Sequence, residues 1–139
     1  MALTASKLKV GDTHSERVVE NLSRTQLVQY AGASGDYNPL HTDEVYTVQA
    51  AGYKSVFAHG MLTMGLTGKM LTNYVGDGRL TNFGVRFTNQ VWPGDTLDAK
   101  ATVEAIREEG GQKLVDLKLS TVNQDGQEVL TGSATARVD

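Results

Sequence analysis

The central part of the chain is one long apolar segment: residues 59–75 read HGMLTMGLTGKMLTNYV. Its apolar side chains fall on most faces of a helical projection, which is typical of a helix buried inside a domain. These residues are Met61, Leu62, Met64, Leu66, Met70, Leu71 and Val75. We therefore predict a buried helix from about His59 to Tyr74.

The sequence after this helix has the pattern of strands, with alternating apolar and polar residues, and one more candidate strand precedes the helix. The strands are predicted at residues 80–91, 96–107, 113–123 and 128–138, and near the start at 10–19. Trp-Pro-Gly-Asp at 92–95 predicts a type II turn, and Gln-Asp-Gly at 124–126 predicts a hairpin. One buried helix followed by antiparallel strands predicts an α+β fold with a curved sheet wrapped around the helix. The alternative is a flatter sheet with helices laid across it.

Two shorter helices are predicted before the central one. Ser23 and Gln26 have the spacing of a capping box, and the helix that they begin should end near Gly32. Thr42 is a suitable N-cap for a second helix, which should stop at Gly52. These two helices flank the most distinctive motif of the chain.

Composition narrows the class of protein. The 139 residues suit a single domain, expected at 1–139, and 40% hydrophobic with 21% charged residues is ordinary for a globular protein. A net charge of −3 without any basic run argues against a nucleic-acid partner. Without cysteine there can be no disulfide, thiolate metal site or cysteine nucleophile, which fits a cytoplasmic protein. We find no pattern of a signal peptide or a membrane span.

The most distinctive motif is YAGASGDYNPLH, residues 30–41. It places the carboxylate of Asp36 five residues before the imidazole of His41, with Asn38 and Pro39 between them. The glycine before the aspartate and Pro39 favour a loop, and a loop with fixed corners can aim both side chains at one point for acid–base chemistry. The alternative is an Asx-rich turn in which Asp36 and Asn38 bond only to the local backbone.

A second candidate lies at the start of the central helix, where residues 56–62 read VFAHGML. The first N–H groups of a helix have no partner within it and form the positive end of the helix dipole. Gly60, which lacks a Cβ, would let a ligand oxygen approach its N–H, as an oxyanion site for a thioester carbonyl requires. The alternative is that Gly60 only lets the helix start pack against the sheet. We expect His59 to be packed and hydrogen-bonded rather than catalytic.

Together the two motifs resemble the hydratase-2 motif of the MaoC-like dehydratases, a family of single hotdog-fold enzymes that act on acyl thioesters, and the resemblance covers nearly the whole chain. VRFT at 85–88 and PGDTL at 93–97 are similar to the first long strand and turn of that family. Within the family the chain most resembles the catalytic β-type subunit of actinobacterial (3R)-hydroxyacyl-carrier-protein dehydratase, through AHGMLTMG at 58–65 and YVGD at 74–77. Gln90 departs from the proline of many relatives, which bears on the geometry of the strand edge and not on catalysis.

This resemblance implies an activity and a division of roles. The family hydrates trans-2-enoyl thioesters to (3R)-3-hydroxyacyl thioesters, or runs the reverse reaction, without a metal or redox cofactor. Asp36 and His41 match its catalytic pair, which would activate one water and return the proton to the α-carbon, while the Gly60 N–H would polarise the thioester carbonyl. The supporting residues implied are Ser34, Asn38 and His59.

The predicted helix after His41 gives this assignment a physical reason. Its N-terminal dipole should disfavour a charged imidazole and keep His41 available as a neutral base. Asp36 could orient that imidazole or take part in the proton transfers itself, and the sequence leaves both roles open.

Two other functions are open to a chain of this fold. A thioesterase would need a carboxylate on the central helix to activate water, and residues 60–75 contain neither Asp nor Glu. An acyl-binding subunit of a heterodimer would be expected to lack Asp36 and His41. The sequence therefore favours the hydratase or dehydratase.

Carrier and assembly are less defined. Lys54, Arg79 and Arg86 are candidates for contacts with the phosphates of coenzyme A or of an acyl carrier protein. The strand at 80–91 should be an open edge that pairs across a two-fold axis, which gives either a homodimer or a heterodimer with a related hotdog subunit. Acyl chain length and physiological direction stay open.

Overall fold

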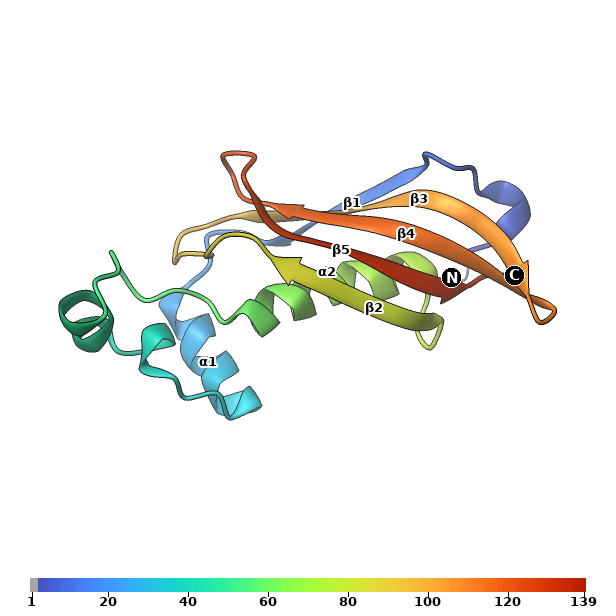
Figure 1. Ribbon diagram of the computed structural model, residues 1–139. Coiled ribbons are helices and arrows are strands. Elements are labelled where there is room, and N and C mark those ends of the chain that lie inside the picture. Colours follow the sequence, from blue (N-terminus) through green and yellow to red (C-terminus); the bar gives the residue numbers. More distant parts are fainter. Residues whose placement is uncertain (1–2) are drawn as a thin grey trace.

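The long apolar segment forms helix α2 (Gly60–Val75), one residue later at each end than predicted. In the computed structural model, which describes residues 3–139, this helix packs against a five-stranded antiparallel sheet that curves over it (Figure 1). The first two residues of the expected domain lie outside the described part. The strands are β1 (Thr13–Val19), β2 (Leu80–Phe87), β3 (Leu97–Glu109), β4 (Gln112–Val122) and β5 (Glu128–Arg137). The α+β class and the candidate strand near the start are thus confirmed.

Small residues on the sheet let α2 lie close to it. Four buried alanines of β3 and β5 belong to the main hydrophobic cluster: Ala99, Ala101, Ala134 and Ala136. Met70 and Leu71 of α2 are fully buried in the same cluster, because alanine leaves room for their longer side chains. Thr67 of α2 and Thr121 of β4 are also fully buried, and their hydroxyl groups bond to each other at 2.7 Å, so this polar pair is satisfied inside the core.

A second hydrophobic cluster lies at the N-terminal end of α2. It joins helix α1 (Arg24–Ser34), the segment that leads into α2 and the adjoining end of the sheet. Its buried members are Leu22, Leu27, Val56, Ala58, Leu62, Val91, Leu97, Val129 and Leu130. Burial of these side chains fixes the start of α2 relative to α1, and the loop that follows α1 is held at that end of the molecule.

Helix α1 begins as predicted and ends later. The Ser23 hydroxyl accepts the Gln26 N–H at 3.0 Å, which confirms the N-cap. The helix continues past Gly32 to Ser34, and Gly35 ends it with a left-handed backbone at φ 77°. The first glycine can remain helical, whereas the second supplies the positive φ that a C-cap requires.

The second short helix differs from the prediction. Pro39–His41 forms a 3₁₀ turn, η2, and Tyr46–Ala50 forms a π-helical turn, η3. Thr42 closes the 3₁₀ turn, because its N–H donates to the Pro39 carbonyl at 3.2 Å. The carboxylate of Asp43 is the cap instead, accepting the Tyr46 N–H at 3.1 Å. This segment is therefore two tight turns and not one regular helix.

The order of strands in the sheet is β1-β3-β4-β5-β2, so β1 and β2 are the two edges. Strand β2 pairs with β5 on one side, from Leu80 opposite Ala136 to Phe87 opposite Leu130, and ends four residues earlier than predicted. Gly94 has a φ of 93° in the turn before β3, as the predicted type II turn requires. Among residues 3–139, none of the helices combines the length and hydropathy needed to span a bilayer.

Candidate active site

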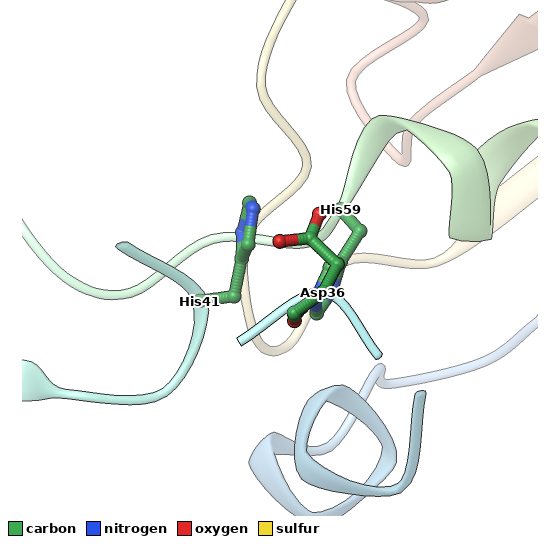
Figure 2. Close-up of side chains that lie close together, drawn as sticks. All are labelled: Asp36, His41 and His59. Carbon is green, nitrogen blue, oxygen red and sulfur yellow. Dashed lines mark hydrogen bonds between the residues drawn. The ribbon is translucent and has the colours of Figure 1, made fainter. Parts of the chain in front are cut away.

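The residues singled out in the loop and at the helix start meet at one end of the molecule. The segment after α1, with η2 and η3, extends beyond the sheet on the side where α2 begins (Figure 1). There, one carboxylate oxygen of Asp36 and one ring nitrogen each of His41 and His59 lie within 4.8 Å of one another. The Asp36 carboxylate points toward the ring of His41 (Figure 2).

Local hydrogen bonds hold the loop around Asp36. The Ser34 hydroxyl accepts the Asp36 N–H at 3.1 Å, and Asp36 Oδ1 accepts the Asn38 N–H at 3.2 Å. Asn38 Oδ1 accepts the Leu40 N–H at 3.1 Å and caps the 3₁₀ turn that ends at His41. The Asx turn considered from the sequence is therefore present, but it leaves Asp36 Oδ2 without a donor among residues 3–139 and the residue exposed. The turn orients the carboxylate through Oδ1 and leaves Oδ2 available for chemistry.

His41 has a defined tautomer. Its Nδ1 lies 2.7 Å from the main-chain oxygen of Phe57, and because a carbonyl only accepts, Nδ1 carries the proton. In the neutral ring Nε2 then has a free lone pair. Burial is the main cause of a lowered pKa of His41, and the nearby His59 lowers this pKa further. The Phe57 carbonyl and Asp36 act in the opposite direction and raise it. The sequence predicted a neutral His41 from a helix dipole, but the main cause is loss of solvent.

His59 is almost completely buried, with 1% of its surface exposed. Its Nε2–H donates to the main-chain oxygen of Asp36 at 3.0 Å. One face of the ring stacks on His41, with centroids 3.9 Å apart, and Tyr30 of α1 contacts it edge-on at 4.8 Å. His59 is therefore packed and hydrogen-bonded, as expected from the sequence.

Two imidazoles and a carboxylate are ligand types that Zn²⁺ binds, but here they do not converge. An imidazole binds a metal ion through a lone pair in its ring plane, about 2 Å from the nitrogen. The rings of His41 and His59 are stacked, with 26° between their planes, so the planes meet too far away for both nitrogens to reach one ion. The stacked arrangement of the two rings therefore does not suit a shared metal ion.

Gly60 is the first residue of α2, and the preceding His59 makes no side-chain capping bond. Among residues 3–139, no acceptor is bonded to the Gly60 N–H. Gly60 also lines a cavity of about 310 Å³ together with residues from β2, the segment after it and β5. The other lining residues are Phe57, Ala58, Thr63, Phe87, Thr88, Asn89, Gln90, Val91 and Val129. The start of α2, with its unpaired N–H, thus lies at the wall of this cavity, whereas Asp36 and His41 are not among the lining residues and His41 lines a second cavity.

Phe87 and Phe57 are site residues that sequence reasoning missed. A Cβ on Gly60 would lie 2.9 Å from the ring of Phe87, so that ring covers the helix start. Phe57 supplies the carbonyl for His41 and its ring contacts the same imidazole edge-on, with centroids 5.3 Å apart. The apolar alternation at 80–91 could have pointed to Phe87, whereas nothing in the sequence marks the Phe57 carbonyl.

The three basic candidates for carrier contacts are not together. Lys54 lies over the ring of Trp92, 4.3 Å from its centroid, and Trp92 contacts Phe57 of the cavity. Arg79 follows the far end of α2 and pairs with Asp139 at 2.8 Å. Arg86 is exposed on β2. Of the three, only Lys54 is connected to the cavity by contacts.

Comparisons with known proteins find a matching family model and relatives named as hydratases or dehydratases. The family model described as "MaoC like domain" matches residues 6–124. An (R)-specific enoyl-CoA hydratase from Rhodospirillum rubrum is 32% identical over 131 residues, which cover 93% of this chain and 88% of that protein. A 3-hydroxyacyl-thioester dehydratase Y from Mycobacterium tuberculosis is 35% identical over 89 residues, 62% of this chain and 31% of that protein. The chain thus matches about a third of the length of the second relative.

Solved structures agree with the sequence comparison. The fold is similar to that of R-Hydratase PhaJ1 from Pseudomonas aeruginosa in the unliganded form, with a TM-score of 0.86 and 27% identity. The match covers 99% of this chain and 86% of that one. The hotdog fold expected from the sequence is confirmed.

Proposed function

This chain belongs to the MaoC-like domain family, and we propose that it catalyses the reversible hydration of trans-2-enoyl thioesters to (3R)-3-hydroxyacyl thioesters. One observation supports this most directly. A neutral imidazole with a free Nε2 and an oriented carboxylate lie close to the start of α2, where Gly60 lines a cavity and its N–H has no acceptor among residues 3–139. These are the parts that addition of water across an enoyl thioester requires.

In this mechanism Asp36 and His41 hold one water between them. His41 Nε2, or the Asp36 carboxylate, removes a proton from the water as its oxygen attacks C3 of the enoyl group. Electrons move onto the thioester oxygen, where the N–H of Gly60 and the positive end of α2 stabilise the enolate. The proton then passes to C2, and the hydroxyacyl thioester leaves. The loop bonds of Ser34 and Asn38 keep the carboxylate aimed during these steps.

The direct test uses purified protein and trans-2-enoyl-CoA esters of increasing acyl length. We expect the enone absorbance to fall and the product to be the (3R) enantiomer. The same esters carried on an acyl carrier protein would show which carrier is preferred. If the Lys54 ammonium contacts a phosphate of that carrier, Lys54→Ala should weaken binding of the carrier. Protein that hydrates none of these esters would refute the proposed function.

The lowered pKa of His41 predicts where kcat/KM falls on the acid side of its pH profile. Because burial disfavours the imidazolium, less than half of His41 is protonated at pH 6.5, the ordinary midpoint of a histidine. If neutral His41 is the base, the midpoint of the acid limb of kcat/KM should lie below pH 6.5. Initial rates from pH 5 to 8 measure this. A midpoint above pH 6.5 would contradict a buried base with a lowered pKa.

We also propose that the chain works as a dimer, either with a second copy or with a related hotdog subunit. Strand β2 is an edge with an unpaired side and carries the exposed Phe87, so it suits pairing with another chain. Light scattering on the chain expressed alone should give a dimer mass for a homodimer, or an aggregating product if the partner is missing. A monodisperse and fully active monomer would refute this assembly.

A further inference from the structure

One ring nitrogen of the buried His59 has no hydrogen-bond partner in the described part of the chain. This atom is Nδ1, and it is itself buried. A buried acceptor without a donor destabilises a fold, whereas an apolar ring of similar size would fill the space without that cost. The rest of the side chain must therefore account for a histidine at this position.

Apart from the edge-on contact with Tyr30, the contacts of the His59 side chain lead to the site. Its Nε2–H holds the main-chain oxygen of Asp36 at 3.0 Å, across 23 residues of sequence. Its ring supports the ring of His41 on one face, at 3.9 Å between centroids. It also directly precedes Gly60, which begins α2 and lines the cavity. One rigid side chain thus touches the loop of the carboxylate, the imidazole and the helix start.

We propose that His59 is a positioning residue for the hydration: its Nε2–H sets the place of Asp36, and its ring keeps water away from the buried face of His41. This inference rests on the proposed function. His59 acts through Asp36 and His41: it is almost completely buried, its Nε2–H is bonded to the main-chain oxygen of Asp36, and one face of its ring lies against His41.

Three charged residues lie near His41 and could change its pKa: Asp36, Arg24 and Glu44. Asp36 lies beside it, and Arg24 and Glu44 share with it a second cavity, of about 420 Å³, on the side of α1. Arg24 and Glu44 pair with each other at 3.3 Å, so their charges largely offset. Burial is the largest cause of the lowered pKa of His41, and the His59 ring is part of what buries it.

Two substitutions separate the two contacts. His59→Phe keeps a ring against His41 but removes the donor to Asp36. We expect kcat to fall roughly tenfold from the misplaced carboxylate, with KM little changed, an acid limb of the pH profile that moves less than in the variant without a ring, and a Tm equal to or above the parent's. His59→Gln keeps an amide donor for Asp36 but removes the ring. We expect kcat at pH 8 to stay within about threefold and the acid limb to move to higher pH, because water reaches His41.

The chain offers a matched control in His14. This histidine of β1 also stacks on an aromatic ring, that of Tyr74, with centroids 4.5 Å apart, and bonds a carboxylate, that of Glu16. Tyr74 lies near the far end of α2, ~21 Å from Gly60 at 1.5 Å per residue. His14→Phe should leave kcat and the pH profile unchanged, whatever it does to Tm.

Nitrogen-15 NMR of the unmodified protein tests the arrangement without substrate. Neutral His59 should carry its proton on Nε2 and neutral His41 on Nδ1. The opposite tautomer of His59, a His59→Phe variant with parental kcat, or a His59→Gln variant with an unmoved acid limb would overturn the inference. Failure of the parent to hydrate any enoyl thioester is a separate result, which refutes the proposed function and leaves the tautomers to decide the arrangement.

Discussion

Asp36→Asn and His41→Gln should each lower the hydration rate roughly 10²-fold or more while the protein stays folded. The asparagine keeps an oxygen for the Asn38 N–H but has no charge to hold or take a proton, and the glutamine has no basic nitrogen. Steady-state rates with a trans-2-enoyl-CoA ester, together with thermal unfolding, measure both effects. If the two groups act as one unit on one water, the double variant should be little slower than the worse single one.

The control for this pair is a substitution that disturbs the same loop without the chemistry. Ser34→Ala removes the hydroxyl that accepts the Asp36 N–H and should cost far less activity than Asp36→Asn. Near-parental turnover of either Asp36→Asn or His41→Gln, with matching thermal unfolding, would refute the catalytic assignment.

Gly60→Val should also reduce turnover strongly, by roughly 10²-fold, through the space around its N–H. A Cβ at this position would meet three ring atoms of Phe87 at 2.9 to 3.1 Å, and the two methyl groups would enter the cavity where the carbonyl must lie. Turnover and Tm of the purified variant measure the effect.

A matched glycine on the same helix separates a blocked site from a changed helix. A Cβ on Gly65 would have no neighbour within 4 Å, so Gly65→Ala should keep activity and gain up to about 1 kcal/mol of stability. Adding Phe87→Ala to Gly60→Val should restore Tm, since the ring that clashes is gone, but not turnover. A double variant as active as Phe87→Ala alone would show that Gly60 only serves packing.

Local signals in the sequence predicted most of the elements. The Ser23 cap, the turn at Gly94 and the apolar helix before Val75 each depend on residues a few positions apart, and all appear in the structure. Asp36 and His41 could be paired for the same reason, because five positions of tightly turned loop leave few ways to separate them. Boundaries were less certain where neighbours compete, as when Asp43 replaced Thr42 as a cap.

Contacts between distant segments could not be predicted in this way. The pairing of Leu80 with Ala136 places β2 at an edge, and the bond from His59 to Asp36 selects a tautomer across 23 residues. Arg79, a candidate carrier contact by charge alone, is paired with Asp139 instead. Periodicity and turn chemistry act over a few residues and so specify helices, strands and one loop. The burial of His41, the cover of Phe87 over Gly60 and the order of strands depend on how those elements pack, and packing is a property of the whole chain.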